Sequence, residues 1–197
     1  GGVITVSGEV GASIVTTLTG QSGIVTKTVT GTGSSQAVVL DSTEVDTLGE
    51  GSVSYSVVQT DDAGNAQTAG AITGTFEIDT VAPAAPKDGL GFTDYTANAA
   101  DATAGFNVTG TGEVGATVTL TFASSTTLVG GNTADVGTDG TWSAAVEAAD
   151  LTAMGEGAEV ITAIQVDVAG NTSAPSTQST LEIDTVLPSA PTGALGA

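Results

Sequence analysis

The sequence predicts an all-β protein made of two tandem β-sandwich domains arranged end to end. Three observations predict this fold class. Apolar residues alternate with small hydroxyl residues, glycine-rich breaks recur at short intervals, and the whole pattern occurs twice at a spacing of roughly 105 residues. A period of that length matches one small domain and not one turn of a solenoid, so we expect about seven short antiparallel strands in each copy and no helical periodicity.

Alternation with a period of two is clearest in residues 117–122 and 52–57. In the first segment valine, leucine and phenylalanine alternate with three threonines, and in the second two valines and a tyrosine alternate with three serines. This pattern is typical of half-buried strands, with the apolar side chains inward and the hydroxyls outward. The dipeptide Asp139-Gly140 favours a tight hairpin turn just before Trp142.

Three short motifs recur in the same order in both copies. They are Gly-Glu-Val-Gly-Ala at residues 8–12 and 112–116, Asp-x-Ala-Gly-Asn at residues 61–65 and 167–171, and Ile-Asp-Thr-x-x-Pro-x-x-Pro at residues 78–86 and 183–191. The prolines of the third motif fix φ and favour extended, stiff connections between domains. We therefore predict repeat 1 at residues 1–82, a proline-containing linker at 83–89, repeat 2 at 90–186 and the start of the next linker at 187–197, with repeat 1 lacking the counterpart of residues 92–104.

The composition is strongly acidic: 22 Asp and Glu residues stand against two lysines, for a formal net charge of −20. Such a chain is repelled by nucleic acid and by anionic membrane surfaces, and no apolar stretch is long enough for direct membrane insertion. Cysteine and histidine are absent, which excludes disulfides and catalytic triads. The acids either keep the protein soluble or bind divalent cations, and their positions must distinguish the two.

Those positions favour a divalent cation at the junctions between domains. We expect the loop between the first two strands and the loop between the last two strands to lie at opposite ends of a sandwich. The central junction would then bring Glu9 and Asp79 of repeat 1 close to Asp167 of repeat 2, with Asn171 beside them. Oxygen ligands from two domains suit Ca²⁺, which accepts about six to eight oxygens, whereas soft metals would need His or Cys.

Further acidic or amide residues complete the predicted set of ligands. They are Asp88 in the linker, Asn98 and Asp101 at the start of repeat 2, Glu113 and Asp184 for the following junction, and Asp61 and Asp62 for the preceding one. Two alternatives stay open. The Asp-x-Ala-Gly-Asn loops are also good turn sequences, because their glycine and asparagine tolerate positive φ. The other acids can equally be ordinary solvated side chains.

Catalysis is not expected. A pair of carboxylates could in principle hydrolyse glycosides, but enzymes rarely carry the same active site twice in one short stretch of chain. The aromatic residues fall at strand positions, where they are far more often core than a sugar-binding platform. They are Tyr55, Phe76, Phe106, Phe122 and Trp142.

The three motifs, taken in order over nearly the whole chain and twice, resemble the bacterial immunoglobulin-like extender repeats of giant type I-secreted (RTX) and biofilm-associated adhesins. The resemblance implies immunoglobulin-like sandwiches, an extracellular place on the bacterial cell surface, and Ca²⁺-stiffened spacers that hold adhesive tips away from the cell. The expected partners are neighbouring repeats of the same chain, and the expected state is a monomer.

One departure from that family concerns the turn before Trp142. The family's turn-Trp motif is present as residues 139–142, but repeat 1 has Gly-Ser-Ser-Gln at residues 33–36, so a weaker core is expected there. Two other functions remain as alternatives: a glycan- or ligand-binding immunoglobulin-like module, and an accessory domain of a secreted polysaccharide-degrading enzyme.

Overall fold

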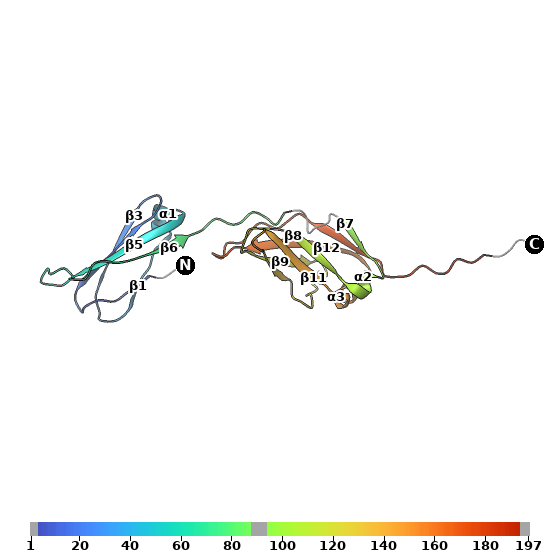
Figure 1. Cartoon of the computed structure of the whole chain (residues 1–197), viewed down its shortest axis with the longest axis horizontal. Helices are drawn as coiled ribbons and strands as arrows, with labels where there is room; N and C mark the ends of the chain where they lie inside the picture. The colour runs from blue at the N-terminus through green and yellow to red at the C-terminus, as the bar shows by residue number, and fades with distance from the viewer. Residues whose placement is uncertain (1–3, 88–93, 194–197) are drawn as a thin grey trace, which may run out of the picture. The chain divides into compact units, whose positions relative to one another are not determined.

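The computed structural model describes residues 4–87 and 94–193, and the chain divides into two compact units, unit 1 at residues 1–80 and unit 2 at residues 81–197 (Figure 1). Both units consist mainly of β-strands, and each is described by itself.

Unit 2 is a two-layered sandwich of seven strands in the part of the chain that the structure describes. Its elements are β7 (Asp94–Ala97), α2 (Asp101–Ala104), β8 (Phe106–Thr111), β9 (Thr117–Phe122), β10 (Thr133–Asp135), β11 (Thr141–Val146), α3 (Ala148–Met154), β12 (Gly157–Val166) and β13 (Ser179–Ile183). One sheet has the order β10-β9-β12-β13-β7 and the other pairs β11 with β8. All neighbours are antiparallel except β13 and β7, the last and first strands, which are parallel.

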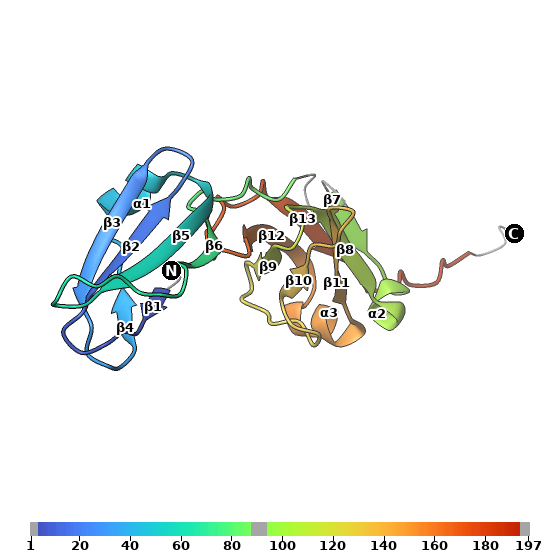
Figure 2. The same ribbon diagram turned by 60° about the vertical axis from the view of Figure 1, so that its left-hand side comes forward.

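The described part of unit 1 repeats this arrangement without a counterpart of the first strand, β7. Its elements are β1 (Ile4–Val6), β2 (Ser13–Thr19), β3 (Ile24–Thr30), β4 (Gln36–Val38), α1 (Ser42–Leu48), β5 (Gly51–Thr60) and β6 (Ile72–Ile78). The sheets are β3-β2-β5-β6 and β1-β4, so β6 corresponds to β13 and, among the described residues, nothing corresponds to β7 (Figure 2). The predicted all-β fold with tandem immunoglobulin-like sandwiches is confirmed.

Short helices, which the sequence pattern did not predict, connect strands in both units. The helix α1 begins with a capping box, in which the Asp41 carboxylate accepts from the Glu44 amide and the Glu44 carboxylate accepts from the Asp41 amide. Glu147 and Asp150 form the same box at the start of α3. Each of these two helices has seven residues, which is too short to show a helical period, so only the caps could have indicated them.

The Asp139-Gly140 turn also differs from its prediction. Gly140 adopts φ +78° and its amide donates to the Gly137 carbonyl, so a tight turn does form before β11. The turn is not a hairpin between sheet neighbours, because β10 and β11 lie in different sheets.

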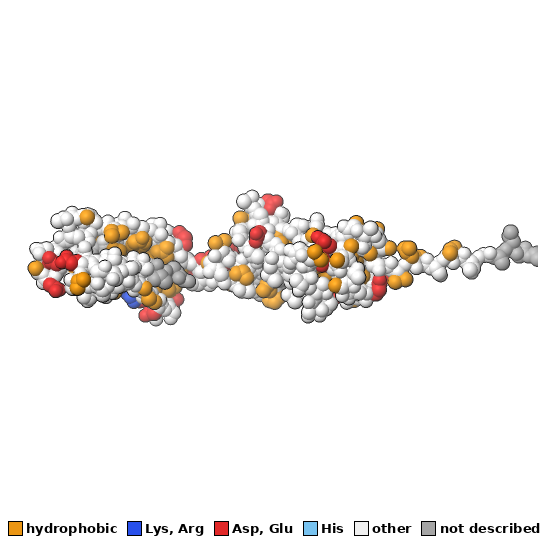
Figure 3. All heavy atoms as spheres, turned by 90° about the horizontal axis from the view of Figure 1, so that it is seen from below, with side chains coloured by type: hydrophobic (Ala, Val, Ile, Leu, Met, Phe, Trp, Pro, Cys, Tyr) orange, Lys and Arg blue, Asp and Glu red, His pale blue; other side chains and the backbone are white. Residues whose placement is uncertain are grey.

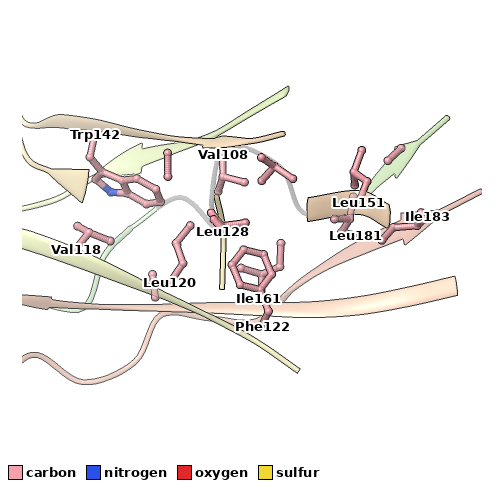
Figure 4. Packing of buried hydrophobic residues seen from close by; sticks show 14 of the residues in the cluster. Val108, Val118, Leu120, Phe122, Leu128, Trp142, Leu151, Ile161, Leu181 and Ile183 are labelled. Atoms are coloured by element: carbon pink, nitrogen blue, oxygen red, sulfur yellow. The ribbon is translucent and has the colours of Figure 1, made fainter. Parts of the chain in front are cut away.

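The core of unit 2 is one continuous cluster of buried side chains from both sheets (Figure 4). Trp142 on β11 is 3% exposed and lies against Gly110, its neighbour on β8. A Cβ at Gly110 would lie 2.6 Å from the Trp142 ring, so the missing side chain makes room for the indole. At the same place in its sheet, unit 1 has Val6 opposite Gln36.

The core of unit 1 is divided into two smaller clusters, and Thr16 lies between their residues on β2. Ile14 belongs to one cluster and Leu18 to the other. Thr16 is 0% exposed and its Oγ1 has no hydrogen-bond partner. In unit 2 the equivalent position is Leu120, which lies opposite Ala163 as Thr16 lies opposite Val57. Leu120 is apolar and belongs to a single continuous core cluster.

Replacing Thr16 with valine is expected to stabilise unit 1 by about 1–2 kcal/mol, because the shape is kept and a buried unsatisfied hydroxyl is removed. Denaturant unfolding of the whole chain measures this as a shift of the transition of unit 1. Thr19→Val, on the same strand but exposed, is the control and should change stability by less than about 0.5 kcal/mol. If Thr16→Val and Thr19→Val changed the stability of unit 1 equally, the buried hydroxyl of Thr16 would not be the source of the gain.

Candidate functional site

The predicted metal ligands of unit 1 lie at opposite ends of its main sheet. The Glu9 amide donates to the Gln59 side-chain oxygen at 3.1 Å, which places the Glu9 loop beside the end of β5. Asp79 follows β6, whose last residue, Ile78, pairs with Gly51 at the start of β5. The prediction that Glu9 and Asp79 lie side by side is therefore wrong.

The physical reason is the number of strands before the loop. In unit 2 the equivalent loop, which contains Glu113, joins the second and third strands, because β7 precedes β8. The described residues of unit 1 contain no counterpart of β7, so the Glu9 loop looks like the first connection of a sandwich, although it corresponds to the second connection of unit 2. Each added strand reverses the chain direction in an antiparallel sheet, so a miscount by one moves a loop to the other end.

Unit 2 has the same division between two ends. The Glu113 amide donates to the Gln165 side-chain oxygen at 2.9 Å, and Asp167 and Asn171 follow directly after β12. At the other end the Asp184 amide donates to the Ala97 carbonyl at 2.9 Å. Asn98 and Asp101 lie there too, where the Asn98 amide donates to the Asp101 carboxylate. Glu113 and Asp184, predicted to serve the same junction, are thus at opposite ends.

Each Asp-x-Ala-Gly-Asn loop is closed by its own aspartate and asparagine. The Asn65 amide and side chain donate to the two oxygens of Asp61 at 2.7 and 2.8 Å, and Asn171 makes the same bonds to Asp167 at 2.8 and 2.9 Å. The side-chain bond from Asn65 is the main cause that lowers the pKa of Asp61. Turn formation is therefore a role that the structure shows for these residues, and metal binding by them stays a prediction.

Asp167 is more enclosed than its counterpart, at 7% exposed. Burial acts to raise the pKa of its carboxyl group, but the bonds from the Asn171 side chain and amide and from the neighbouring loop amides outweigh burial and hold the pKa below its usual value. The side chain is consequently ionised at neutral pH. Asp62 is the second residue of the corresponding loop in unit 1, where its carboxylate lies close to Gly11 of the Glu9 loop.

Gln165 holds the N-terminal segment of unit 2, a role that the sequence pattern did not predict. Its side chain is 1% exposed, and its Nε2 donates to the Ala84 carbonyl at 2.5 Å while its oxygen accepts from Glu113. The Lys87 amide also donates to the Thr111 carbonyl, at 3.2 Å. Residues 84–87 are thus part of unit 2. The available signal was the recurrence of Gln two residues before the Asp-x-Ala-Gly-Asn loop in both copies.

A second repeated device holds the chain where it leaves each sandwich. The Glu50 carboxylate accepts from the amide and the hydroxyl of Thr80, and Glu156 accepts in the same way from Thr185. The threonine hydroxyl bond is the main cause that lowers the pKa of each glutamate. We call these two contacts the exit clamps.

The exit clamps depend on glycines that flank each glutamate. The residues before and after Glu50 have φ +77° and +93°, and those around Glu156 have +82° and +109°. L-amino acids with side chains rarely adopt these values, so Gly-Glu-Gly in both copies is the local requirement for the clamp. This tripeptide was present in the sequence and was not recognised as a motif.

Within the described residues of the chain, no group of three or more acidic side chains is arranged to hold a metal ion. Asp88 lies outside the described residues. The donor types, carboxylate and amide oxygens without His or Cys, fit a hard cation, but neither unit assembles enough of them alone. Acidic side chains on the face seen in Figure 3 lie in small separate groups among polar and apolar surface.

The aromatic side chains predicted to belong to the cores do so, and Trp142 and Phe122 are buried. Tyr95, which was not among them, packs on Phe106 with ring centroids 4.8 Å apart. Phe76 and Tyr55 are half-buried against the core of unit 1. The described residues therefore offer no exposed aromatic platform for a glycan. None of their helices has the length and apolar character needed to cross a membrane.

No protein-family model and no curated protein matches the sequence. The solved structures similar to this chain include repeat regions of large bacterial adhesins. One is a 1.5-MDa bacterial ice-binding adhesin, with 26% identity and a TM-score of 0.39 over 94% of this chain and 59% of that one. Another is a tetra-tandem repeat from the extending region of a large adhesion protein, with 22% identity and a TM-score of 0.39 over 89% of this chain and 42% of that one.

A third similar structure is a Ca²⁺-stabilized adhesin with which an Antarctic bacterium binds ice, with 26% identity and a TM-score of 0.39 over 94% of this chain and 45% of that one. This chain spans about half the length of these adhesin structures. Because every one of these TM-scores is below 0.5, the immunoglobulin-like architecture rests on the strand pairing described above.

Proposed function

We propose that this chain is a pair of extender repeats from a bacterial cell-surface adhesin of the type I-secreted RTX kind, stiffened by Ca²⁺ at the junctions between repeats. In this role it is a spacer and not an enzyme. It is extracellular, it acts as a monomer whose partners are neighbouring repeats of the same chain, and it projects adhesive domains for attachment to surfaces and in biofilms.

The observation that carries the spacer role is that the connecting chain is bound on both sides. Thr80 is held to unit 1 by the Glu50 exit clamp, and Ala84 is held to unit 2 by Gln165. Only residues 81–83 separate these two anchored positions, and one of them is Pro83, whose ring fixes φ. A connection this short and this restrained suits a protein that must keep its repeats apart.

Calcium supplies the remaining restraint in this proposal. Asp79 directly precedes the clamped Thr80, and Glu113 and Asp167 lie at the end of unit 2 that binds residues 84–87. These carboxylates are the ligands that we assign to the central junction. Glu9, which the sequence predicted beside Asp79, is not among them. Carboxylates without a cation repel one another, so the junction is expected to loosen when calcium is removed.

Small-angle scattering and thermal unfolding of the whole chain test this role, first in millimolar CaCl₂ and then in excess chelator. Calcium is expected to narrow the distribution of the overall length of the chain in the scattering. It should also raise the free energy of unfolding by about 1.4 kcal/mol for each site when free calcium is tenfold above Kd. Dimensions and melting temperature that are the same in both solutions would refute the stiffening by calcium and leave the fold intact.

The repeat supplies a matched pair of variants for the same experiment. Asp79→Asn is expected to abolish the response of the scattering to calcium, because it removes a carboxylate that we assign to the central junction. Asp184→Asn changes the equivalent residue, which follows β13 in unit 2, and should leave that response unchanged. If both variants respond to calcium like the wild type, Asp79 does not bind the ion.

A further inference from the structure

The turn before β11 contains a chemically labile dipeptide, Asp139-Gly140. In an unfolded chain an aspartate that precedes glycine isomerises readily, because glycine has no side chain to shield its amide nitrogen. The sequence contains this dipeptide at Asp88 and at Asp139, and Asp88 lies outside the described residues. In repeat 1 the place of Asp139 is taken by Gly33, so this turn carries the labile pair in unit 2 and not in unit 1.

The isomerisation is a reaction between two groups of the dipeptide itself. The amide nitrogen of Gly140 attacks Cγ of the neutral Asp139 carboxyl group, a C–N bond forms, and the carboxyl hydroxyl leaves as water with the amide proton. Water then opens the resulting succinimide ring at the former backbone carbonyl of Asp139. The product is an isoaspartate of unchanged mass, in which the backbone runs through Cβ and Cγ, and no oxidant or other reactant is needed.

The folded turn occupies both reacting groups. The Gly140 amide donates to the Gly137 carbonyl at 2.9 Å. The Asp139 Oδ1 accepts from the amide of Thr141 at 3.0 Å and from its hydroxyl at 2.8 Å. These bonds, the amide first and then the hydroxyl, lower the pKa of the Asp139 carboxyl group. The carboxyl group is therefore ionised and has no hydroxyl that can leave, while the attacking nitrogen is held in a hydrogen bond.

The position of the turn makes the modification costly for unit 2. The Gly137 amide donates to the Thr141 carbonyl at 2.8 Å, and the Gly112 amide donates to the Gly140 carbonyl at 2.9 Å. The next residue of the chain is the buried Trp142. Isomerisation would insert a methylene group into the backbone between these bonds, and would therefore shift Thr141 and Trp142 relative to their partners on β8.

We propose that Asp139 is a site of isoaspartate formation that the native turn keeps closed, and that Thr141 is the residue that holds it closed. The modification then forms when unit 2 opens, and it prevents the opened chain from packing Trp142 again. Isoaspartate at this position therefore accumulates in chains that have unfolded. The proposal does not depend on calcium or on the spacer role.

Prolonged incubation of the whole 197-residue chain in mildly acidic buffer, with and without denaturing urea, tests the proposal. Peptide mapping measures isoaspartate at Asp139 separately from Asp88. The rate at Asp139 is expected to be at least about tenfold lower in the folded chain than in urea, because a local opening must precede the reaction. Equal rates in the two solutions would overturn the proposal.

A pair of exposed threonines supplies the matched variants. Thr141→Val removes the hydroxyl bond to Asp139 and keeps the backbone amide, so the rate in the folded chain should rise about two- to tenfold, the range that the loss of one hydrogen bond gives. The rate in urea should not change. Thr109→Val, on the neighbouring strand β8, is the control and should alter neither rate. An unchanged rate for folded Thr141→Val, or an equal rise in both variants, would contradict the role of Thr141.

The modified chains test the effect on packing. Trp142 is the only tryptophan of the sequence, so its fluorescence reports on this part of unit 2 alone. After urea is removed, chains that carry isoaspartate at position 139 should show the emission of a solvated tryptophan, and unmodified chains should show that of a buried one. Buried emission from both would show that the modification does not prevent the return of Trp142, and would overturn that part of the proposal.

Discussion

Replacing Gln165 with alanine is expected to destabilise unit 2 by about 2–4 kcal/mol and to release residues 84–87 from its surface. The Gln165 side chain is buried and satisfies two backbone groups on separate segments, the Glu113 amide and the Ala84 carbonyl. Alanine would leave both groups without that bond and would open a cavity. The two lost bonds taken together cost about 1–2 kcal/mol, and the cavity costs about as much again. Denaturant unfolding and hydrogen exchange at Glu113 measure the two effects.

Two further variants separate the contributions of the two bonds. Gln165→Glu keeps the acceptor for Glu113 but replaces the donor with an oxygen that repels the Ala84 carbonyl. It should therefore release the linker segment while Glu113 remains protected. Gln59→Ala removes the equivalent side chain in unit 1, which is only half-buried and accepts from Glu9 at 3.1 Å. A loss from Gln59→Ala as large as that from Gln165→Ala would contradict the role assigned to Ala84.

Replacing Trp142 with alanine is expected to cost unit 2 about 3–5 kcal/mol, the largest effect of any substitution considered. The indole is 3% exposed, packs in the continuous core and fills the space left by Gly110. The unfolding midpoint of unit 2 should fall accordingly, while that of unit 1 should not move. Gln36→Ala, at the matching position of unit 1, is the control and should cost much less.

The two units also provide a test of how Trp142 and Gly110 depend on each other. Gly110→Val alone should be destabilising, because the new side chain would enter the ring of Trp142. Combining Gly110→Val with Trp142→Gln recreates the Val6 and Gln36 pair of unit 1 and should recover part of the loss. A double variant whose loss equals the sum of the single losses would show that the two positions do not interact.

Local patterns predicted the strands well. The alternation over residues 117–122 coincides with β9, and that over 52–57 lies inside β5. The comparison of the two copies also predicted that repeat 1 lacks the counterpart of residues 92–104, and among the described residues of unit 1 no strand corresponds to β7. These features depend on side chains that alternate between core and solvent within a few residues, which a sequence records directly.

The grouping of the acids could not be predicted in the same way. The end of the sandwich at which Glu9 lies depends on how many strands precede it, and an error of one strand exchanges the two ends. The contact between Gln165 and Ala84 joins residues 81 positions apart, and nothing in either local sequence indicates the other. The exit clamps had a local signal, Gly-Glu-Gly in both copies, but its meaning requires knowing that Thr80 returns beside it.

The parallel pairing of β7 with β13 has a mechanical consequence for unit 2. The chain enters the sandwich through one of these strands and leaves through the other, and they are hydrogen-bonded neighbours. A force that pulls the two ends of the sandwich apart would therefore slide β7 and β13 past each other in shear. The hydrogen bonds between these two strands would then have to break together and not one after another. Such a module would resist extension through the pairing of its first and last strands.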